Sequence, residues 1–222
     1  MEKIKQIYLI RRVSVWLFGV ALLVLGVSMG TSSGLGIAPM SSFPLALSRA
    51  LGVRFSVLIG GYYLLLVAAQ FLIRGKDYRK MDLLQLPFSF IFSALMDVAE
   101  RFLVFHFDHL WQNILLQAGS IVVLGIGVVL TVGMRIAPNP TDGLVYTISD
   151  HYRKDLGLVK NIADTISVSS ACVLDLVFGG KLSSAGLGTV MAMIFIGRVV
   201  ALVNRSFSAR LFAWVGLKQR AA

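Results

Sequence analysis

The sequence has few charged residues and almost no cysteine. Charged side chains make up 14% of its 222 residues, against roughly 25% in soluble domains. The single Cys172 excludes an internal disulfide, and with it a fold that depends on an oxidising compartment. Hydrophobic residues reach 57%, against about 45–50% in soluble domains. This composition excludes a water-soluble globule, a disordered chain, a coiled coil and a disulfide scaffold.

Long apolar runs are what the sequence has instead. A helix that crosses a bilayer needs about 20 apolar residues, or about 17–25 when it is tilted. The runs are continuous rather than alternating, which favours helices over strands, and the first is too long for a cleaved signal peptide. Six runs qualify, at residues 13–33, 54–73, 83–104, 114–133, 158–178 and 185–203. The sequence therefore predicts an all-α, polytopic membrane protein with six transmembrane helices.

The basic residues indicate which way the chain crosses the membrane. A net charge of +10 resembles a nucleic-acid signal, but a nucleic-acid patch would cluster on one soluble element. Here Lys and Arg lie between the apolar runs, and 16 of the 21, including Arg79, Lys218 and Arg220, fall on one side of a six-span path. Basic loops stay in the cytoplasm. We expect a bilayer and no nucleic acid as partner, a bacterial cytoplasmic membrane, and both termini in the cytoplasm.

The chain also repeats itself. Residues 15–39 align without gaps with residues 114–138, at an offset of 99, and both segments end on Ile-Ala-Pro. Further on, Gly52 matches Gly157 and Gly75 matches Gly180 at an offset of 105. That second offset predicts six extra residues after the Ala-Pro motif of the second copy.

Each copy of the repeat, 1–106 and 107–222, holds three predicted spans. Because three is odd, the second copy enters the membrane from the opposite side. Inverted repeats with interrupted helices are the architecture of many transporters, with the binding site at the repeat interface. Hourglass channels share this arrangement, so the repeat alone does not separate a carrier from a channel.

The connection after the first span of each copy breaks one helix and starts a short one. In the first copy glycines and Pro39 break the helix, and Ser41 or Ser42 can cap the next one. Thr141 or Asp142 would cap the equivalent helix in the second copy. Each short helix has about 10–12 residues, too few to cross the bilayer. It lies at the interface or dips into the membrane; in the second case its N-terminus suits anions or polar groups.

Three short motifs carry a family resemblance. They are Gly36-Ile37-Ala38-Pro39, Pro140-Thr141-Asp142-Gly143-Leu144, and Gly186-Leu187-Gly188-Thr189 followed by Ile196-Gly197. At these residues the chain resembles the YczE/YitT-like bacterial membrane proteins, a poorly characterised group, over nearly its whole length. Relatives often show Trp-Asp where this chain has Met40-Ser41-Ser42, and proline where it has Arg198. The resemblance implies the fold and the membrane location, and it implies no substrate.

Charged residues inside the predicted spans are further candidates. A charge at a helix centre costs roughly 2.5–3.5 kcal/mol. Estimated depths match Asp164 on the fifth span with Arg198 on the sixth, which predicts an ion pair between them. Asp97 can pair with Arg101, four residues on. Asp97 and Asp164 are candidates for an ion or proton relay; the alternative is a structural salt bridge with small-residue helix packing.

Several polar residues carry weaker signals. Asp175 lies near the outer interface, where solvation explains its charge. His106, Asp108 and His109 could bind a metal, but a wet interfacial loop explains them better. We therefore expect no metal and no cofactor.

These features rank three functions. No hydrolase elbow, His-Glu-x-x-His, P-loop or intramembrane-protease motif occurs, so we expect no enzyme. The first hypothesis is a secondary transporter of a small solute, driven by a coupling ion. The alternatives are an inverted-repeat channel and a non-transporting scaffold or accessory subunit, and a homo-oligomer or a membrane partner protein is compatible with each. The candidate substrate-binding residues are Ser41, Ser42, Thr141, Asp142, Asp164 and Arg198.

Overall fold

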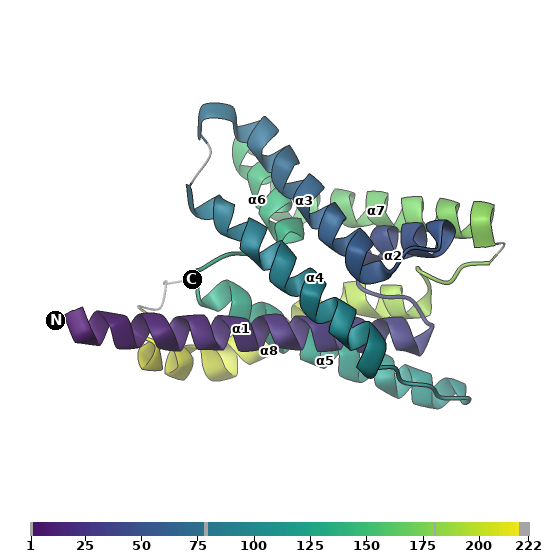
Figure 1. Ribbon diagram of the computed structural model, residues 1–222, viewed down its shortest axis with the longest axis horizontal. Coiled ribbons are helices and arrows are strands. Elements are labelled where there is room, and N and C mark those ends of the chain that lie inside the picture. The colour runs from purple at the N-terminus through teal and green to yellow at the C-terminus, as the bar shows by residue number, and fades with distance from the viewer. Residues whose placement is uncertain (1, 78–79, 180, 218–222) are drawn as a thin grey trace.

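The chain folds into helices joined by short connections (Figure 1). The computed structural model describes residues 2–77, 80–179 and 181–217, and these ranges contain no strand. Arg79, Gly180, Lys218 and Arg220, used in the predictions above, lie outside them. The elements are α1 (Glu2–Ser33), α2 (Pro39–Leu51), α3 (Phe55–Arg74), η1 (Gly75–Asp77), η2 (Lys80–Leu84), α4 (Gln85–Phe102), α5 (Leu110–Gly133), α6 (Pro140–Tyr152), α7 (Leu156–Leu174), η3 (Asp175–Gly179) and α8 (Leu187–Trp214).

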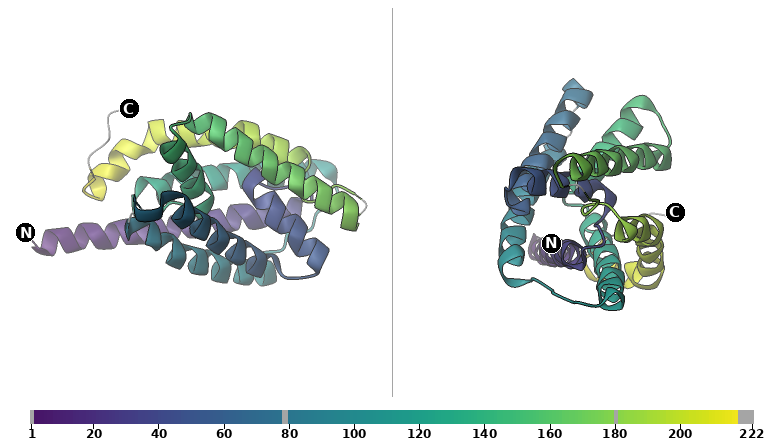
Figure 2. Two further views of the ribbon diagram at one scale, coloured as in Figure 1. Left: turned by 90° about the horizontal axis from the view of Figure 1, so that it is seen from above. Right: turned by 90° about the vertical axis from the view of Figure 1, so that its right-hand side faces the viewer.

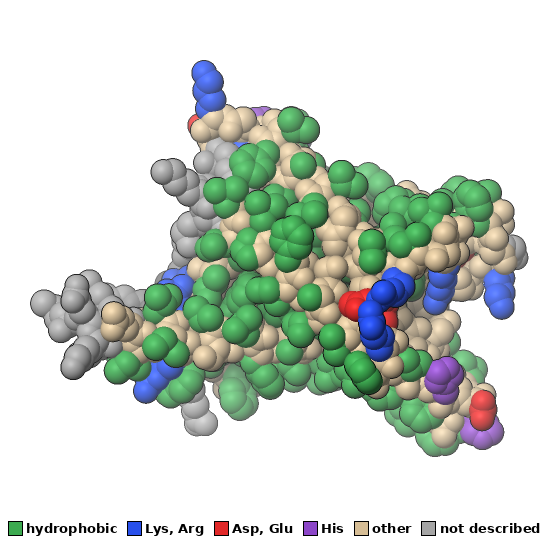
Figure 3. Space-filling view, viewed as in Figure 1, with side chains coloured by type: hydrophobic (Ala, Val, Ile, Leu, Met, Phe, Trp, Pro, Cys, Tyr) green, Lys and Arg blue, Asp and Glu red, His purple; other side chains and the backbone are tan. Residues whose placement is uncertain are grey.

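Six of the described helices are long and apolar enough to cross a membrane. They confirm the all-α fold and the six predicted spans, with boundaries that differ by a few residues. Figure 3 shows a face covered largely by hydrophobic side chains, with the few charged ones mostly toward the two ends of the long axis. Lipid favours such helices because every backbone N–H and C=O is paired inside the helix itself. The six segments are Gln6–Ser33, Phe55–Asp77, Asp82–Phe102, Leu110–Gly133, Leu156–Gly179 and Leu187–Phe207.

The helices form two bundles, and each bundle takes members from both halves of the chain (Figures 1 and 2). The first bundle contains α1, α5 and α8, the second contains α2, α3, α6 and α7, and α4 lies between them, packing on α3 more extensively than on α1. Within the second bundle α2 packs mainly on α7, and α6 mainly on α3, so each short helix lies against a long helix of the other half. The contacts of α4 with α3 and α1 thus join the two bundles.

The first bundle is built around the antiparallel pair α1 and α5 (Figure 1). A Cβ atom added at Gly127 would lie 3.0 Å from the backbone nitrogen of Leu23, and one at Gly26 would lie 3.1 Å from that of Leu124. The Ser120 hydroxyl also donates to the carbonyl oxygen of Gly26 (2.7 Å). Small residues bring two helix backbones together inside a membrane, where the hydrophobic effect does not. These glycines therefore set the separation of α1 and α5.

An aromatic cluster fills the junction of the two bundles. Trp16 of α1, Tyr63 of α3 and Phe88 and Phe92 of α4 are all buried. The ring centroids of Tyr63 and Phe92 are 5.2 Å apart, and those of Trp16 and Phe88 are 5.8 Å apart in an edge-on arrangement. Tilted and edge-on pairs are the favoured aromatic geometries. The cluster fixes α3 against α1 and α4, and two of its members, Tyr63 and Phe92, line the cavity described below.

The two short helices end in the same way, which corrects the predicted alignment. Gly52 after α2 and Arg153 after α6 both adopt left-handed backbone angles (φ +64° and +51°). The Ser48 hydroxyl donates to the carbonyl oxygen five residues on (2.7 Å), and the Ser149 hydroxyl does likewise (2.8 Å). Gly52 therefore corresponds to Arg153, not to Gly157, which lies inside α7. The match of Gly52 with Gly157 gave the wrong alignment, because a residue other than glycine can adopt the left-handed conformation at the end of a helix.

Replacing Arg153 by glycine is expected to raise the thermal stability. A residue with a Cβ atom pays roughly 1–2 kcal/mol in the left-handed region, and glycine pays nothing there. Part of this gain is offset because glycine is freer in the unfolded chain, so we expect a net gain of about 0.5–1 kcal/mol. Thermal unfolding of the purified protein in detergent measures it. Gly52→Ala should lower the Tm; if both variants shift it in the same direction, the assignment of the two caps is wrong.

Candidate functional site

A cavity of about 390 Å³ lies between the two bundles. Each of the helices α1 to α8 contributes at least one residue to its wall. Residues of α1, α5 and α8 supply a mostly apolar side, and the starts of α2, α6 and α7 supply a polar one. The polar and charged residues of the wall are Ser41, Tyr63, Asn139, Thr141, Asp142, Lys160, Asn161 and Asp164.

The first turn of α6 forms part of this polar wall. Asn139 caps the helix, because its side-chain oxygen accepts a hydrogen bond from the backbone N–H of Thr141 (3.1 Å). The predicted cap at Thr141 or Asp142 is therefore wrong. Proline fits the first helical position because its missing N–H needs no partner there, so Pro140 starts the helix and the cap falls one residue earlier. Thr141 and Asp142 are thereby free to line the cavity.

The first turn of α2 lies at the same cavity. Ala38 precedes the helix and offers no side-chain cap, so the predicted cap at Ser41 or Ser42 is also wrong. The carbonyl oxygen of Pro39 accepts hydrogen bonds from the hydroxyls of Ser42 (2.6 Å) and Ser167 of α7 (2.8 Å). Ser42 is fully buried in this contact and does not line the cavity, whereas Ser41 does.

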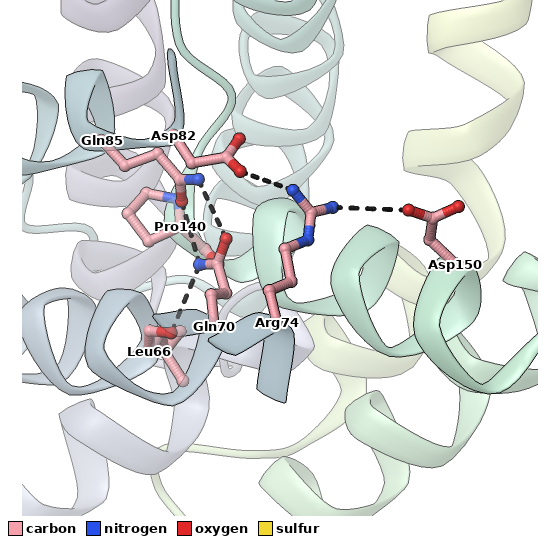
Figure 4. Close-up of polar contacts among 7 residues, drawn as sticks. All are labelled: Leu66, Gln70, Arg74, Asp82, Gln85, Pro140 and Asp150. Atoms are coloured by element: carbon pink, nitrogen blue, oxygen red, sulfur yellow. Dashed lines mark hydrogen bonds and ion pairs between the residues drawn. The ribbon is translucent and has the colours of Figure 1, made fainter. Parts of the chain in front are cut away.

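Two glutamines hold the start of α6 against α3 and α4 (Figure 4). The side-chain amides of Gln70 and Gln85 exchange hydrogen bonds of 3.0 and 2.9 Å, and both are buried. Gln70 also donates to the carbonyl oxygen of the first residue of α6 (3.3 Å). One turn further along α3, Arg74 forms ion pairs with Asp82 and Asp150. Buried amides that bond to each other favour one arrangement of the helices that carry them. This cluster therefore fixes the position of the first turn of α6, which belongs to the polar wall.

Four of the six predicted binding residues meet at the cavity. Ser41 comes from the first half of the chain, and Thr141, Asp142 and Asp164 from the second. Ser41 and Thr141 are only 7% and 5% exposed, yet neither hydroxyl has a hydrogen-bond partner among the described residues. Asp142 stands at the third position of α6, where the positive end of the helix dipole favours a carboxylate. Ser41, Thr141 and Asp164 are buried and Asp142 is half-buried, and all four line the cavity.

The predicted ion pair between Asp164 and Arg198 is wrong. An oxygen of the buried Asp164 lies 3.4 Å from the ammonium nitrogen of Lys160, one turn earlier on α7. Arg198 is exposed, and its guanidinium lies 5.5 Å from the ring centroid of Phe195 on its own helix. The depth estimate assumed that α7 and α8 pack side by side. Instead α7 packs on α2 and α8 on α5, with the cavity between them.

Asp97 is separate from this site. It forms an ion pair with Arg101 (2.8 Å), as predicted, and a second one with Arg54 at the start of α3. It is partly exposed and does not line the cavity. Two arginines thus compensate its charge near the ends of α3 and α4. Its predicted part in an ion or proton relay stays a prediction.

Four polar residues of the wall escaped the sequence analysis. Lys160 was counted only as a basic loop residue, although its spacing of four from Asp164 is the spacing of a helical ion pair. Asn139 directly precedes a proline, which is a cap signal. Tyr63 and Asn161 carry no such signal. The Tyr63 hydroxyl accepts a long hydrogen bond from the Asn139 amide (3.5 Å), which ties α3 to the start of α6.

A second, apolar cavity of about 580 Å³ adjoins the first. It lies within the second bundle, between α2, α3, α6 and α7, and Met40 lines both cavities. Its wall is almost entirely hydrocarbon, with the aromatic rings of Phe43, Tyr62 and Tyr152. The described part of the chain holds no group of three His, Cys, Asp or Glu side chains placed to bind a metal.

The glycine motif at the start of α8 is packed against the first half of the chain. The backbone N–H of Gly188 donates to the carbonyl oxygen of Leu35 (2.7 Å). Gly36 has a φ of +97°, and a Cβ atom there would lie 2.7 Å from the backbone nitrogen of Gly186. Two of the motifs singled out in the sequence thus contact one another. Their contact is made by closely packed backbone, and these glycines do not line the cavity.

Residues 10–205 match a family of unknown function, DUF6198. The chain belongs to DUF6198. No curated protein and no solved structure matches it. Nothing in these comparisons supports the relation to YczE/YitT-like proteins, which stays a resemblance. Because no activity is established for DUF6198, the function of this member has to be inferred from its cavity.

Proposed function

We propose that this DUF6198 member is a secondary transporter that moves a small solute across the cytoplasmic membrane. The observation that carries the proposal is the cavity between the two bundles, whose buried polar groups come from both halves of the chain. Ligand sites in helical membrane proteins lie at such interfaces, beside the ends of interrupted helices. Polar groups held inside a membrane are costly to retain without a role.

The two halves, 1–106 and 107–222, are proposed to be inverted repeats. In support, α1 and α5 run antiparallel, and the exchanged pairs α2–α7 and α3–α6 map onto each other when the halves are swapped. The basic residues support a cytoplasmic location of the end where α1 starts and α8 ends. At that end the Arg11 guanidinium donates to the carbonyl oxygen of Trp214 (3.1 Å).

The two-bundle arrangement offers a route for alternating access. Contacts between the bundles are concentrated along α3 and α4, whereas α7 and α8 face each other across the cavity. Tilting one bundle against the other about the α3–α4 contact would open the cavity between α7 and α8. Rigid rocking of one bundle against another is the usual motion of carriers with internal repeats.

Filling the cavity is expected to abolish transport. Ala192 of α8 is buried and lines the cavity, so Ala192→Phe should place a ring inside it. Ala201 lies on the exposed surface of the same helix, and Ala201→Phe is the matched control. Proteoliposomes with an inward proton gradient are given a mixture of metabolites, and accumulated solutes are identified by mass spectrometry. We expect saturable uptake that Ala192→Phe lowers at least about tenfold, while Ala201→Phe retains it.

The other outcomes separate the alternatives. Uptake that neither saturates nor responds to the gradient would indicate a channel. No uptake of any metabolite by the folded wild-type protein would contradict transport and favour a scaffold. Equal loss of uptake in both alanine variants would place the effect outside the cavity. Thermal unfolding of each variant shows whether it is folded.

A further inference from the structure

We infer that the cavity binds a monovalent organic cation, an ammonium group attached to a hydrocarbon body. This inference rests on the proposed function and names the class of solute. It follows from the charges, the unpartnered hydroxyls and the aromatic and apolar surfaces that line the cavity.

The charges of the cavity leave one carboxylate without a partner. Its wall contains two acidic residues, Asp142 and Asp164, and one basic residue, Lys160. The ammonium of Lys160 pairs with Asp164. Asp142 has no ion pair or hydrogen bond among the described residues; burial raises the pKa of its carboxyl, and the charge of Lys160 on the neighbouring helix offsets this only in part. A carboxylate enclosed in a membrane protein requires a compensating cation.

Two hydroxyl residues line the same cavity as this carboxylate. Ser41 and Thr141, at the starts of α2 and α6, are more than nine-tenths buried and line the cavity without partners among the described residues. An unpartnered hydroxyl in a buried site costs free energy unless a ligand or water pairs with it. An ammonium N–H can donate both to hydroxyl oxygens and to a carboxylate. The buried hydroxyls therefore complete a set of acceptors.

The rest of the wall fits the body of an organic cation rather than a bare metal ion. Tyr63 and Phe92 present aromatic rings to the cavity, and ring faces attract ammonium groups. Apolar side chains such as Leu124, Val128 and Ile196 line the cavity as well. A volume of about 390 Å³ is within the range of small-molecule sites and far exceeds that of an alkali ion. Apolar side chains make no favourable contact with an inorganic ion, whereas they can pack against the hydrocarbon part of an organic cation.

The test compares four probes that share a benzene ring and differ in the charged or polar groups attached to it. They are benzylammonium, benzyl alcohol, benzoate and the zwitterion 4-(aminomethyl)benzoate. Binding to the full chain in detergent is measured by calorimetry, at constant ionic strength. We expect the dissociation constant of benzylammonium to be at least about tenfold lower than those of the other three probes. A tenfold difference corresponds to the binding free energy that one charge-assisted hydrogen bond contributes. Asp142→Asn should remove this preference, and the exposed Asp108→Asn should not.

Each other result overturns the inference. Tight binding of benzoate or of the zwitterion would make the cavity a site for another class of solute, and the transport proposal would survive. Displacement of benzylammonium by sodium chloride at millimolar concentration would indicate an inorganic cation site. No binding of any probe, or no effect of Asp142→Asn, rejects the site as described. If Asp142→Asn does not fold, Ser41→Ala replaces it and should weaken benzylammonium binding about threefold to tenfold.

The transport proposal fails independently of this test. It depends on metabolite uptake and on the contrast between Ala192→Phe and Ala201→Phe. Uptake of a neutral or anionic metabolite would retain the transporter and reject the cation. Tight benzylammonium binding without any metabolite uptake would retain the site and reject the transporter.

Discussion

Replacing Gly127 by valine is expected to destabilise the protein more than any other single change considered. The Cβ atom would lie 3.0 Å from the backbone nitrogen of Leu23, so relief requires α1 and α5 to move apart. Overpacking a tight contact costs about 1–3 kcal/mol, and a clash with backbone belongs at the upper end. We expect a loss of about 3 kcal/mol, measured by thermal unfolding in detergent and by the yield of monodisperse protein.

The control is a glycine of α3 that has open space around it. A Cβ atom at Gly61 would meet nothing within 4 Å, so Gly61→Val carries the same change in helix propensity without the clash. It should leave the Tm nearly unchanged. Gly127→Ala should fall between the two valine variants. Equal losses from Gly127→Val and Gly61→Val would show that α1 and α5 do not depend on close backbone contact.

Replacing Asp175 by alanine is expected to have the second largest effect. The carboxylate is only 4% exposed and accepts the backbone N–H groups of Ser183 (2.7 Å) and Ser184 (2.6 Å). It also accepts the Ser184 hydroxyl (2.9 Å), to which the Arg49 guanidinium donates in turn (3.3 Å). Removing it leaves two backbone donors near the start of α8 unpaired, at about 1–3 kcal/mol each. We expect a net loss of about 2–3 kcal/mol in thermal unfolding.

Asp155, at the opposite end of α7 from Asp175, provides the comparison. Asp155 caps the start of α7 by accepting one bond from the backbone N–H of Leu158 (2.8 Å), and it is exposed. Asp155→Ala should cost about 1 kcal/mol, the usual value of a helix cap. A smaller loss for Asp175→Ala than for Asp155→Ala would mean that solvation explains Asp175, as the sequence analysis supposed.

Local patterns could be read from the sequence, and pairings between distant segments could not. Asp97 and Arg101 are four apart on one helix, and their ion pair was predictable from spacing alone. Lys160 and Asp164 have the same spacing, and that pair was overlooked in favour of a more distant partner. Depth along the membrane limits which residues can meet, but it does not say which helices are neighbours.

The helix caps were mispredicted for a local reason. Ser41, Ser42, Thr141 and Asp142 are all good capping residues, but a proline occupies the first position of each short helix, so the N-cap positions are Ala38 and Asn139, two to four residues before the predicted caps. The residues that were wrongly predicted as caps nevertheless include residues of the site. Residues that cap nothing are free to face a cavity, and three of these four do.

The sequence by itself determined the six membrane-spanning helices, the two short helices and the positions at which helices break. These follow from apolar length, glycine and proline, which act within one segment of chain. Only the tertiary structure decided that each short helix packs against the other half, and that a cavity separates α7 from α8. It also decided that Arg198 is exposed while Asp164 is buried. In lipid, apolar helix faces are nearly equivalent partners, so neighbours are chosen by close fit between small residues and buried polar contacts, which form only when distant segments meet.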